Sequence, residues 1–224
     1  KVKIGNNYNN IGYIYNKKGQ IKKALINHNL SLSIREEIED KAGMAESYNN
    51  LGIIYYYQDE KEQAVKYLEK SLEMKKMLGD KARIASTLST LGSIYSTTGE
   101  LQKSLLYQEE SLNLSEEISD SLSIGYALNN IGALYRTYGD PRCDSSLDCR
   151  TISRGKAIAN FRRCLSIMKN LGHKPSITGS YFNIGTMYFQ LKKIKEAEKF
   201  AQLGLDLALE IQTPSYIERC ASLL

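Results

Sequence analysis

The sequence repeats one short pattern at a nearly fixed interval, which restricts the chain to a small group of architectures. Each copy has an apolar residue, then glycine, then tyrosine three positions later, as in Leu51-Gly52-Ile53-Ile54-Tyr55. The five repeated glycines are Gly12, Gly52, Gly92, Gly132 and Gly185. Three successive intervals are 40 residues long, and the last is 53. A regular period of this size predicts a solenoid, in which each unit buries its apolar face against the next.

A second set of positions follows the same period and carries small side chains. They are Ala24, Ala64, Ser104, Ala157 and Ala197. Seven residues later another small residue precedes leucine, at Ser31, Ser71, Ser111, Cys164 and Gly204. Small residues at fixed points let two helix backbones approach closely while larger neighbours fill the grooves. Because glycine inside a helix costs roughly 1 kcal/mol relative to alanine, the aligned glycines also indicate close helix contacts.

The pattern predicts eleven helices, two in each repeat and a half-helix that begins near residue 215. The first helices are expected at 2–17, 41–57, 81–97, 121–138 and 174–190. The second helices are expected at 20–38, 60–78, 100–118, 155–171 and 193–211.

We expect a single all-α domain over residues 1–224. Its repeats cover 1–40, 41–80, 81–120, 121–173 and 174–213, with a partial sixth repeat at 214–224. Lys1 aligns with Lys41, the first residue of a repeat, and the last residues stop in the middle of an expected helix. We therefore expect a piece of a longer protein.

Residues that begin and end helices agree with these spans. Asp40, Asp80 and Asp120 each precede a first helix, where a side-chain oxygen can accept from free backbone N–H groups. Thr213 before Pro214 predicts another capped start, and His173 in the fifth repeat would be a weaker cap. Left-handed glycines are expected to end first helices at Gly19, Gly99 and Gly139.

The longer last interval reflects an insertion at about 140–153, between the two helices of the fourth repeat. It contains Pro141 and a polar cluster, and shows no helical or strand periodicity. We expect an exposed, mobile loop, which either has a function or is only tolerated. Cys143 and Cys149 lie within it, but a disulfide between them is disfavoured in a reducing compartment. With no second pair and no nearby histidine, zinc binding is not expected.

Composition and charge argue against several classes of protein. No run of about 18 apolar residues is present, so no membrane span is expected, and the polar N-terminal residues do not form a signal peptide. The net charge of +5 is far below the basic stripe of a nucleic-acid binder. These features predict a soluble cytoplasmic protein that binds neither membrane nor nucleic acid.

Residues with catalytic or metal-binding spacing are also missing from the sequence. The two histidines, His28 and His173, lie in different repeats, and neither has a cysteine or carboxylate at ligand or nucleophile spacing. The glycines are accounted for by packing and turns rather than by a phosphate-binding loop. We expect no enzyme activity, no cofactor and no metal.

The repeated residues together resemble the tetratricopeptide repeat over essentially all 224 residues. The usual unit has about 34 residues, and the longer unit here resembles that of kinesin light chains, Pins-type spindle scaffolds and bacterial sensory proteins. The classical tryptophan is replaced, at Tyr8, Tyr48, Leu88, Leu128 and Tyr181. The resemblance implies an all-α, right-handed α-solenoid, or superhelix, of helix-turn-helix repeats.

In such a superhelix the first helices line a concave groove, and the resemblance places a row of polar residues there. Two residues before each repeated glycine stand Asn10, Asn50, Thr90, Asn130 and Asn183, and one residue earlier stand Asn9, Asn49 and Asn129. Asparagine both donates and accepts hydrogen bonds, so the resemblance implies a ladder that holds the backbone of an extended peptide. Alternatively, the asparagines bond neighbouring helices across repeats, and one residue could do both.

Two further groove residues are candidates for contact with a partner. Tyr13 follows the first repeated glycine and offers a large rigid surface. Arg136 could belong to a basic patch around the fourth repeat, although scattered solvated arginines are the alternative.

The expected partner is a protein or peptide segment. The carboxylate clamp of co-chaperone tetratricopeptide domains is not expected, because its matching positions here are Asn9, Tyr13, Asn50, Ser86 and Thr90, which carry no cation. The alternatives are a self-associating structural solenoid and a helical-repeat RNA-binding module. In bacterial relatives of this kind the repeats precede a signalling output domain, which implies a sensory or regulatory role.

Overall fold

The computed structural model describes residues 1–143 and 147–224, and every regular element in these ranges is an α-helix. The helices are α1 (Val2–Lys17), α2 (Ile21–Glu37), α3 (Lys41–Tyr57), α4 (Lys61–Leu78), α5 (Lys81–Thr98), α6 (Leu101–Glu117), α7 (Ser121–Tyr138), α8 (Leu147–Asn170), α9 (Lys174–Gln190), α10 (Ile194–Glu210) and α11 (Pro214–Ala221). The all-α prediction is confirmed. Apart from the start of α8, each predicted boundary agrees to within one residue.

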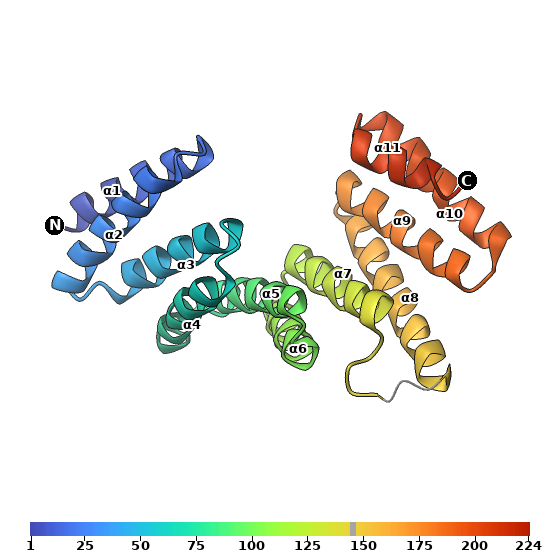
Figure 1. Cartoon of the computed structure of the whole chain (residues 1–224), viewed down its shortest axis with the longest axis horizontal. Helices are drawn as coiled ribbons and strands as arrows, with labels where there is room; N and C mark the ends of the chain where they lie inside the picture. Colours follow the sequence, from blue (N-terminus) through green and yellow to red (C-terminus); the bar gives the residue numbers. More distant parts are fainter. Residues whose placement is uncertain (144–146) are drawn as a thin grey trace. The chain divides into compact units, whose positions relative to one another are not determined.

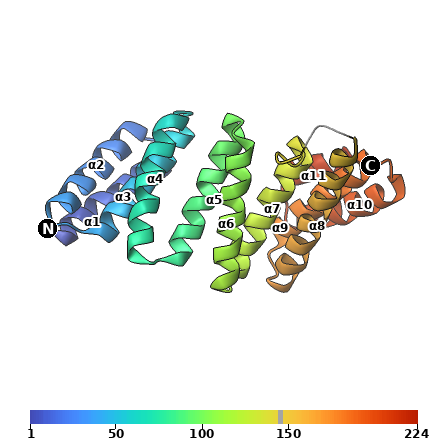
Figure 2. The same cartoon turned by 90° about the horizontal axis from the view of Figure 1, so that it is seen from below.

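Close packing divides the chain into two compact units, Lys1–Gly99 and Glu100–Leu224. In the first unit α1 pairs with α2 and α3 with α4, and α1 also contacts α3 (Figures 1 and 2). In the second unit α7 pairs with α8 and α9 with α10, and α9 contacts both α7 and α11. Each unit therefore contains stacked helix pairs, as in an α-solenoid, and the remaining helices pack beside them: α5 contacts α4, and α6 contacts α7.

Four of the repeated glycines, Gly12, Gly52, Gly132 and Gly185, lie where a first helix crosses the second helix of its own repeat. A Cβ atom added at Gly52 would come within 2.7 Å of Leu68 Cγ, and one at Gly132 within 2.7 Å of Phe161 Cε1. Leu68 and Phe161 are fully buried at matching positions of α4 and α8. Close approach of the two backbones thus requires glycine at these crossings, as the sequence predicted.

Buried serines at the repeated small positions add hydrogen bonds to this packing. Ser31 Oγ donates to the Gly5 carbonyl at 2.8 Å, and Ser71 Oγ donates to the Ala45 carbonyl at the same distance. A small side chain at these points therefore permits close contact and also satisfies a backbone acceptor of the facing helix.

The expected aspartate caps are all present. Asp40 accepts from Gly43 N, Asp80 from Arg83 N, and Asp120 from Ser123 N. The cap predicted at Thr213 is wrong, because its hydroxyl donates to the Ile211 carbonyl and makes no capping bond. His173 likewise makes no capping bond. Gly19, Gly99 and Gly139 have positive φ as expected, but Gly139 has ψ −169° and so does not adopt the left-handed helical conformation that Gly99 adopts.

The expectation of an exposed loop at 140–153 is wrong for residues 147–153, which belong to α8, and for Asp140, which is buried. Residues 141–143 form a turn in which Arg142 and Cys143 are exposed, and residues 144–146 lie outside the described part of the chain. Helix α8 begins at Leu147 rather than near 155, because an existing helix extends at little cost once it is nucleated. Ser153 Oγ donates to the Cys149 carbonyl at 2.8 Å and accepts from Asp140 N at the same distance. These bonds join the end of α7 to the added turns of α8.

Asp140 holds the start of the insertion through buried polar contacts. Its carboxylate accepts from Lys156 Nζ at 2.6 Å and from Arg142 Nε at 3.1 Å. Burial opposes ionisation, but these hydrogen bonds outweigh it and lower the pKa of Asp140 from 3.8 to about 2. Cys143 and Cys149 form a disulfide, contrary to expectation, and Cys149 is buried.

His28 gives the first unit an expected dependence on pH. Its ring is buried and its Nδ1 lies 3.0 Å from Asn9 Oδ1, so the neutral ring donates to that acceptor. Burial, and then the charge of Arg35, lower the pKa of His28 from 6.5 to about 4. Between these values the unfolded chain binds a proton that the folded chain does not, so the free energy of unfolding falls as the pH is lowered.

We expect His28→Gln to remove this pH dependence of the free energy of unfolding while keeping a hydrogen-bond donor for Asn9. As the pH falls from about 7 to 5, the free energy of unfolding of the wild type should decrease by up to about 2 kcal/mol more than that of the variant, allowing for solvent screening. Urea unfolding of both proteins across this range measures the difference. Parallel pH profiles would show that His28 titrates normally in the folded protein.

Candidate binding groove

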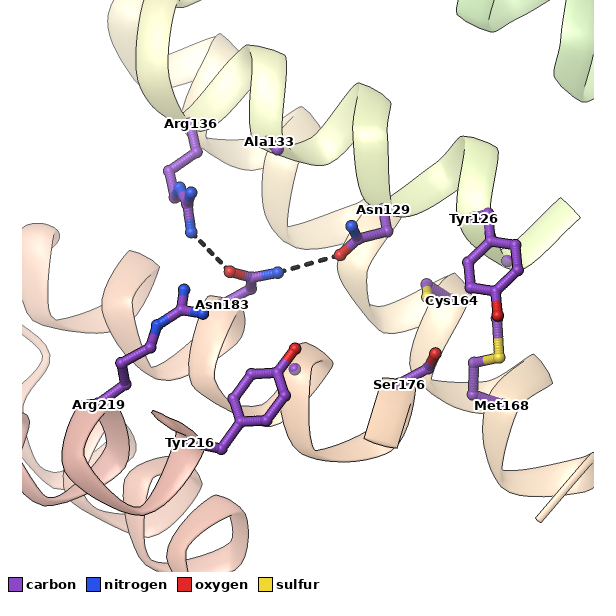
Figure 3. A pocket seen from close by; sticks show the side chains of 12 residues that line it. Tyr126, Asn129, Ala133, Arg136, Cys164, Met168, Ser176, Asn183, Tyr216 and Arg219 are labelled. Carbon is purple, nitrogen blue, oxygen red and sulfur yellow. Dashed lines mark hydrogen bonds between the residues drawn. The ribbon is translucent and has the colours of Figure 1, made fainter. Parts of the chain in front are cut away.

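The second unit contains a cavity of about 310 Å³ lined by side chains of α7, α8, α9 and α11 (Figure 3). We call it the unit 2 groove. Its lining residues are Gly125, Tyr126, Asn129, Ala133, Arg136, Cys164, Met168, Ser176, Gly179, Asn183, Tyr216 and Arg219. Three of these, Asn129, Arg136 and Asn183, are site residues predicted from the sequence.

Asn183 stands at the centre of a hydrogen-bonded row that crosses this groove. Its Oδ1 accepts from Arg136 Nη1 at 2.5 Å, and its Nδ2 donates to Asn129 Oδ1 at 3.0 Å (Figure 3). Only 8% of Asn183 is exposed. Asn129 uses its oxygen in this row, and its own NH2 group has no protein partner in the described part of the chain. The row therefore bonds α7 to α9 and leaves donors available to a ligand.

Arg219, from the short helix α11, brings a second guanidinium group into the same cavity. The group lies over the Phe182 ring at 4.2 Å from its centroid and over the Tyr216 ring at 5.4 Å. Burial, and then the nearby charge of Arg219, lower the pKa of Arg136, which nevertheless remains protonated at neutral pH. The groove thus combines fixed positive charge with amide and phenol groups.

The first unit contains a comparable cavity of about 380 Å³, which we call the unit 1 groove. Its lining residues are Asn9, Glu46, Asn49, Asn50, Lys75, Arg83 and Ser86. Asn50 Nδ2 donates to Asn9 Oδ1 at 2.9 Å. Asn183 and Asn129 form the same bond at matching repeat positions in unit 2. Part of the asparagine row therefore joins successive first helices, and this contact does not exclude ligand binding.

Asn49 is held differently, by a lysine from a second helix. Lys75 Nζ donates to Asn49 Oδ1 at 2.9 Å and to Thr87 Oγ1 at 2.6 Å. Burial, followed by repulsion from Arg83, lowers the pKa of Lys75 from 10.5 to about 8. The unit 1 groove also holds Glu46, which forms ion pairs with Arg35 at 3.3 Å and with Arg83 at 3.6 Å.

The remaining predicted site residues line neither of these two cavities. Thr90 Oγ1 donates to the Ser86 carbonyl of its own helix, and Asn130 Nδ2 donates to Gln108 Oε1 at 3.4 Å. Asn10 is exposed. Tyr13 is 54% exposed and lies beneath Lys17. Peptide contact by these four residues stays a prediction.

Several lining residues that were not predicted from the sequence lie one helical turn before the asparagine row. Glu46, Ser86, Tyr126, Gly179 and Arg219 occupy this matching position in successive repeats, and all five line a groove. Extending the row by one turn toward the N-terminus would have found them. Tyr216 was missed because it belongs to the incomplete sixth repeat.

The described residues contain no group of three or more His, Cys, Asp or Glu side chains arranged to hold a metal ion. Among the helices that the structure describes, none is both long and apolar enough to cross a membrane.

Three family models match the chain, each described as a tetratricopeptide repeat. They cover residues 3–77, 84–120 and 178–210, which together are more than half of the sequence. Among curated proteins, none matches the chain.

Solved structures resemble the chain at low sequence identity. One is the putative kinesin light chain of Podosopora anserina, with nearly identical TPR-like repeats: TM-score 0.70, 13% identity, covering 93% of this chain and 96% of that one. Aspartyl phosphate phosphatase F of Bacillus subtilis has a TM-score of 0.80 at 17% identity, covering 95% of this chain and 52% of that one. A Pyrococcus horikoshii signal transduction ATPase with a tetratricopeptide repeat sensor has a TM-score of 0.80 at 19% identity. The match covers 96% of this chain and 32% of that one. At these identities the likeness concerns the fold.

Proposed function

Because this chain belongs to the tetratricopeptide repeat family, we propose that it is a non-catalytic module that holds an extended segment of a partner protein in the unit 2 groove. The single observation that carries the proposal is the cavity itself, where α7, α9 and α11 bring amide, phenol and guanidinium groups together. Repeat solenoids present such concave surfaces to their partners.

The unused hydrogen-bonding groups of the unit 2 groove suit a peptide backbone. The free NH2 group of Asn129 can donate to a backbone carbonyl. Because Asn183 fixes Asn129 from one side, this donor is held in place before a ligand arrives, which lowers the entropic cost of binding. Tyr126 is 44% exposed beside it and offers an aromatic surface for a partner side chain.

We further propose a regulatory setting for this binding. The similar Pyrococcus horikoshii protein carries its tetratricopeptide repeats as a sensor in a signal transduction ATPase. A sensor of this type would report partner binding to another domain of a larger protein. Self-association is the second candidate, in which the bound segment comes from another copy of the same chain.

The test is capture of partners from native cell extract by the wild type and by Ala133→Trp, with identification by mass spectrometry. Ala133 lines the groove directly after Gly132, so tryptophan there would fill space that a ligand needs. We expect the partner to be lost from the variant, while circular dichroism shows unchanged helix content.

Ser166→Trp is the matched control, since Ser166 is exposed on α8 and does not line the groove. It should retain the partner. Equal capture by wild type and Ala133→Trp would refute binding in this groove. If the captured protein is the same chain, light scattering over a concentration series would establish self-association instead.

A further inference from the structure

We propose that Arg136 and Arg219 form an anion subsite in the unit 2 groove, which binds a glutamate or aspartate side chain of an acidic partner segment. This inference rests on the proposed function and gives the partner a chemical character. It concerns a side-chain carboxylate, bound between α7 and α11.

The charge balance of the groove is the first argument. Its lining includes two arginines and no acidic residue. Neither guanidinium pairs with a carboxylate in the described residues: Arg136 donates to the neutral Asn183, and Arg219 stacks on two rings. The two neighbouring like charges repel each other, and the partial burial of Arg136 adds to the cost. A carboxylate placed between them would offset the repulsion.

The geometry of the two side chains is the second argument. Figure 3 shows them extending from α7 and α11 toward Asn183. Asn183 holds one nitrogen of Arg136, and the Phe182 and Tyr216 rings support the plane of Arg219. A guanidinium has five N–H donors, so most donors of each group remain for a ligand. Such planar forks match the two oxygens of a carboxylate.

The unit 1 groove provides an internal contrast. There Glu46 occupies the repeat position that Arg219 occupies in unit 2, and it neutralises Arg35 and Arg83. These two arginines therefore already have an anionic partner within the chain, and the other cation of that groove, Lys75, donates to Asn49 and Thr87. The unit 2 groove has two arginines and no acidic lining residue, so charge complementarity favours it for the acidic ligand.

The test uses short peptides of alternating glycine and glutamate, or glycine and glutamine, blocked at both ends and carrying a neutral fluorescent dye. Fluorescence anisotropy measures their affinity for the whole chain. The glutamate peptide should bind at least about tenfold more tightly, as expected for charge-assisted hydrogen bonds. Arg136→Gln and Arg219→Gln should each weaken its binding by a similar factor, with unchanged helix content and melting temperature.

Arg150→Gln is the charge-matched control, because Arg150 is exposed on α8 and outside the groove. It should leave the affinity unchanged. The subsite is overturned if Arg150→Gln weakens binding as much as the groove variants, or if the glutamate peptide does not bind at about 1 mM. Binding of a phosphoserine peptide without binding of the glutamate peptide would also overturn it.

Failure of this inference differs from failure of the proposed function. If both peptides bind equally and Ala133→Trp abolishes both interactions, the groove binds peptide but has no anion subsite. If Ala133→Trp keeps its captured partner while the arginine variants lose the glutamate peptide, the anion subsite stands and the proposed use of the groove fails.

Discussion

Arg35→Ala is expected to lower the free energy of unfolding by about 3–5 kcal/mol, the largest effect we expect from a single substitution. Arg35 lies on α2, is 2% exposed, and bonds α1 and α3 at the same time. Its Nη1 donates to the Gly43 carbonyl at 2.7 Å and to Ser47 Oγ at 2.9 Å. Its Nη2 donates to Asn6 Oδ1 at 2.8 Å.

Alanine would remove the donor from the buried Gly43 carbonyl and the buried Ser47 hydroxyl and would open a cavity between the helices. Urea unfolding of the wild type and the variant measures the loss. Arg83→Ala is the control, because Arg83 is half exposed in its ion pair with Asp80. This substitution should lower the free energy of unfolding by no more than about 1 kcal/mol. A similar small cost for Arg35→Ala would show that water replaces its hydrogen bonds.

Gly52→Leu is expected to destabilise the first unit by about 3 kcal/mol through overpacking. The first added atom would lie 2.7 Å from Leu68 Cγ and 3.2 Å from the Ala64 carbonyl oxygen. The leucine side chain can shift, but the backbone oxygen moves only with α4. The higher helix propensity of leucine offsets roughly 1 kcal/mol of this cost.

Gly155→Leu tests whether the effect comes from packing rather than from the loss of a glycine. Gly155 also lies inside a helix, α8, but an added Cβ there would meet no atom within 4 Å. The free energy of unfolding of this variant should rise by up to about 1 kcal/mol. Thermal melting measures the change in melting temperature of both variants, and equal changes would refute the packing role of Gly52.

The helices were predictable because their signals are local. Each repeat carries its own small residues and turn residues, and Asp40, Asp80 and Asp120 cap helices through bonds within two or three residues. Such bonds depend on near neighbours in the chain. Thr213 shows the limit of this reasoning, since a suitable residue type at the right position bonds to another acceptor.

The candidate site was predictable in part. The repeat register identified Asn129, Arg136 and Asn183, which the structure brings together. It also identified Asn10 and Tyr13, which line neither groove, because a register position does not specify what a side chain contacts. Arg219 was missed, although it supplies half of the proposed anion subsite.

The all-α class, the repeat family, the helix boundaries apart from the start of α8, and the need for glycine at helix crossings could all be predicted from the sequence alone. Which polar groups use their donors within the protein, and which remain for a ligand, depends on how the helices pack in three dimensions. Arg136 and Asn183 are 47 residues apart and meet at 2.5 Å. Cys149 and Asp140 became buried through contacts that the pattern of the insertion does not encode. Local periodicity sets where a helix forms, whereas charge balance and hydrogen-bond satisfaction depend on side chains from several helices at once.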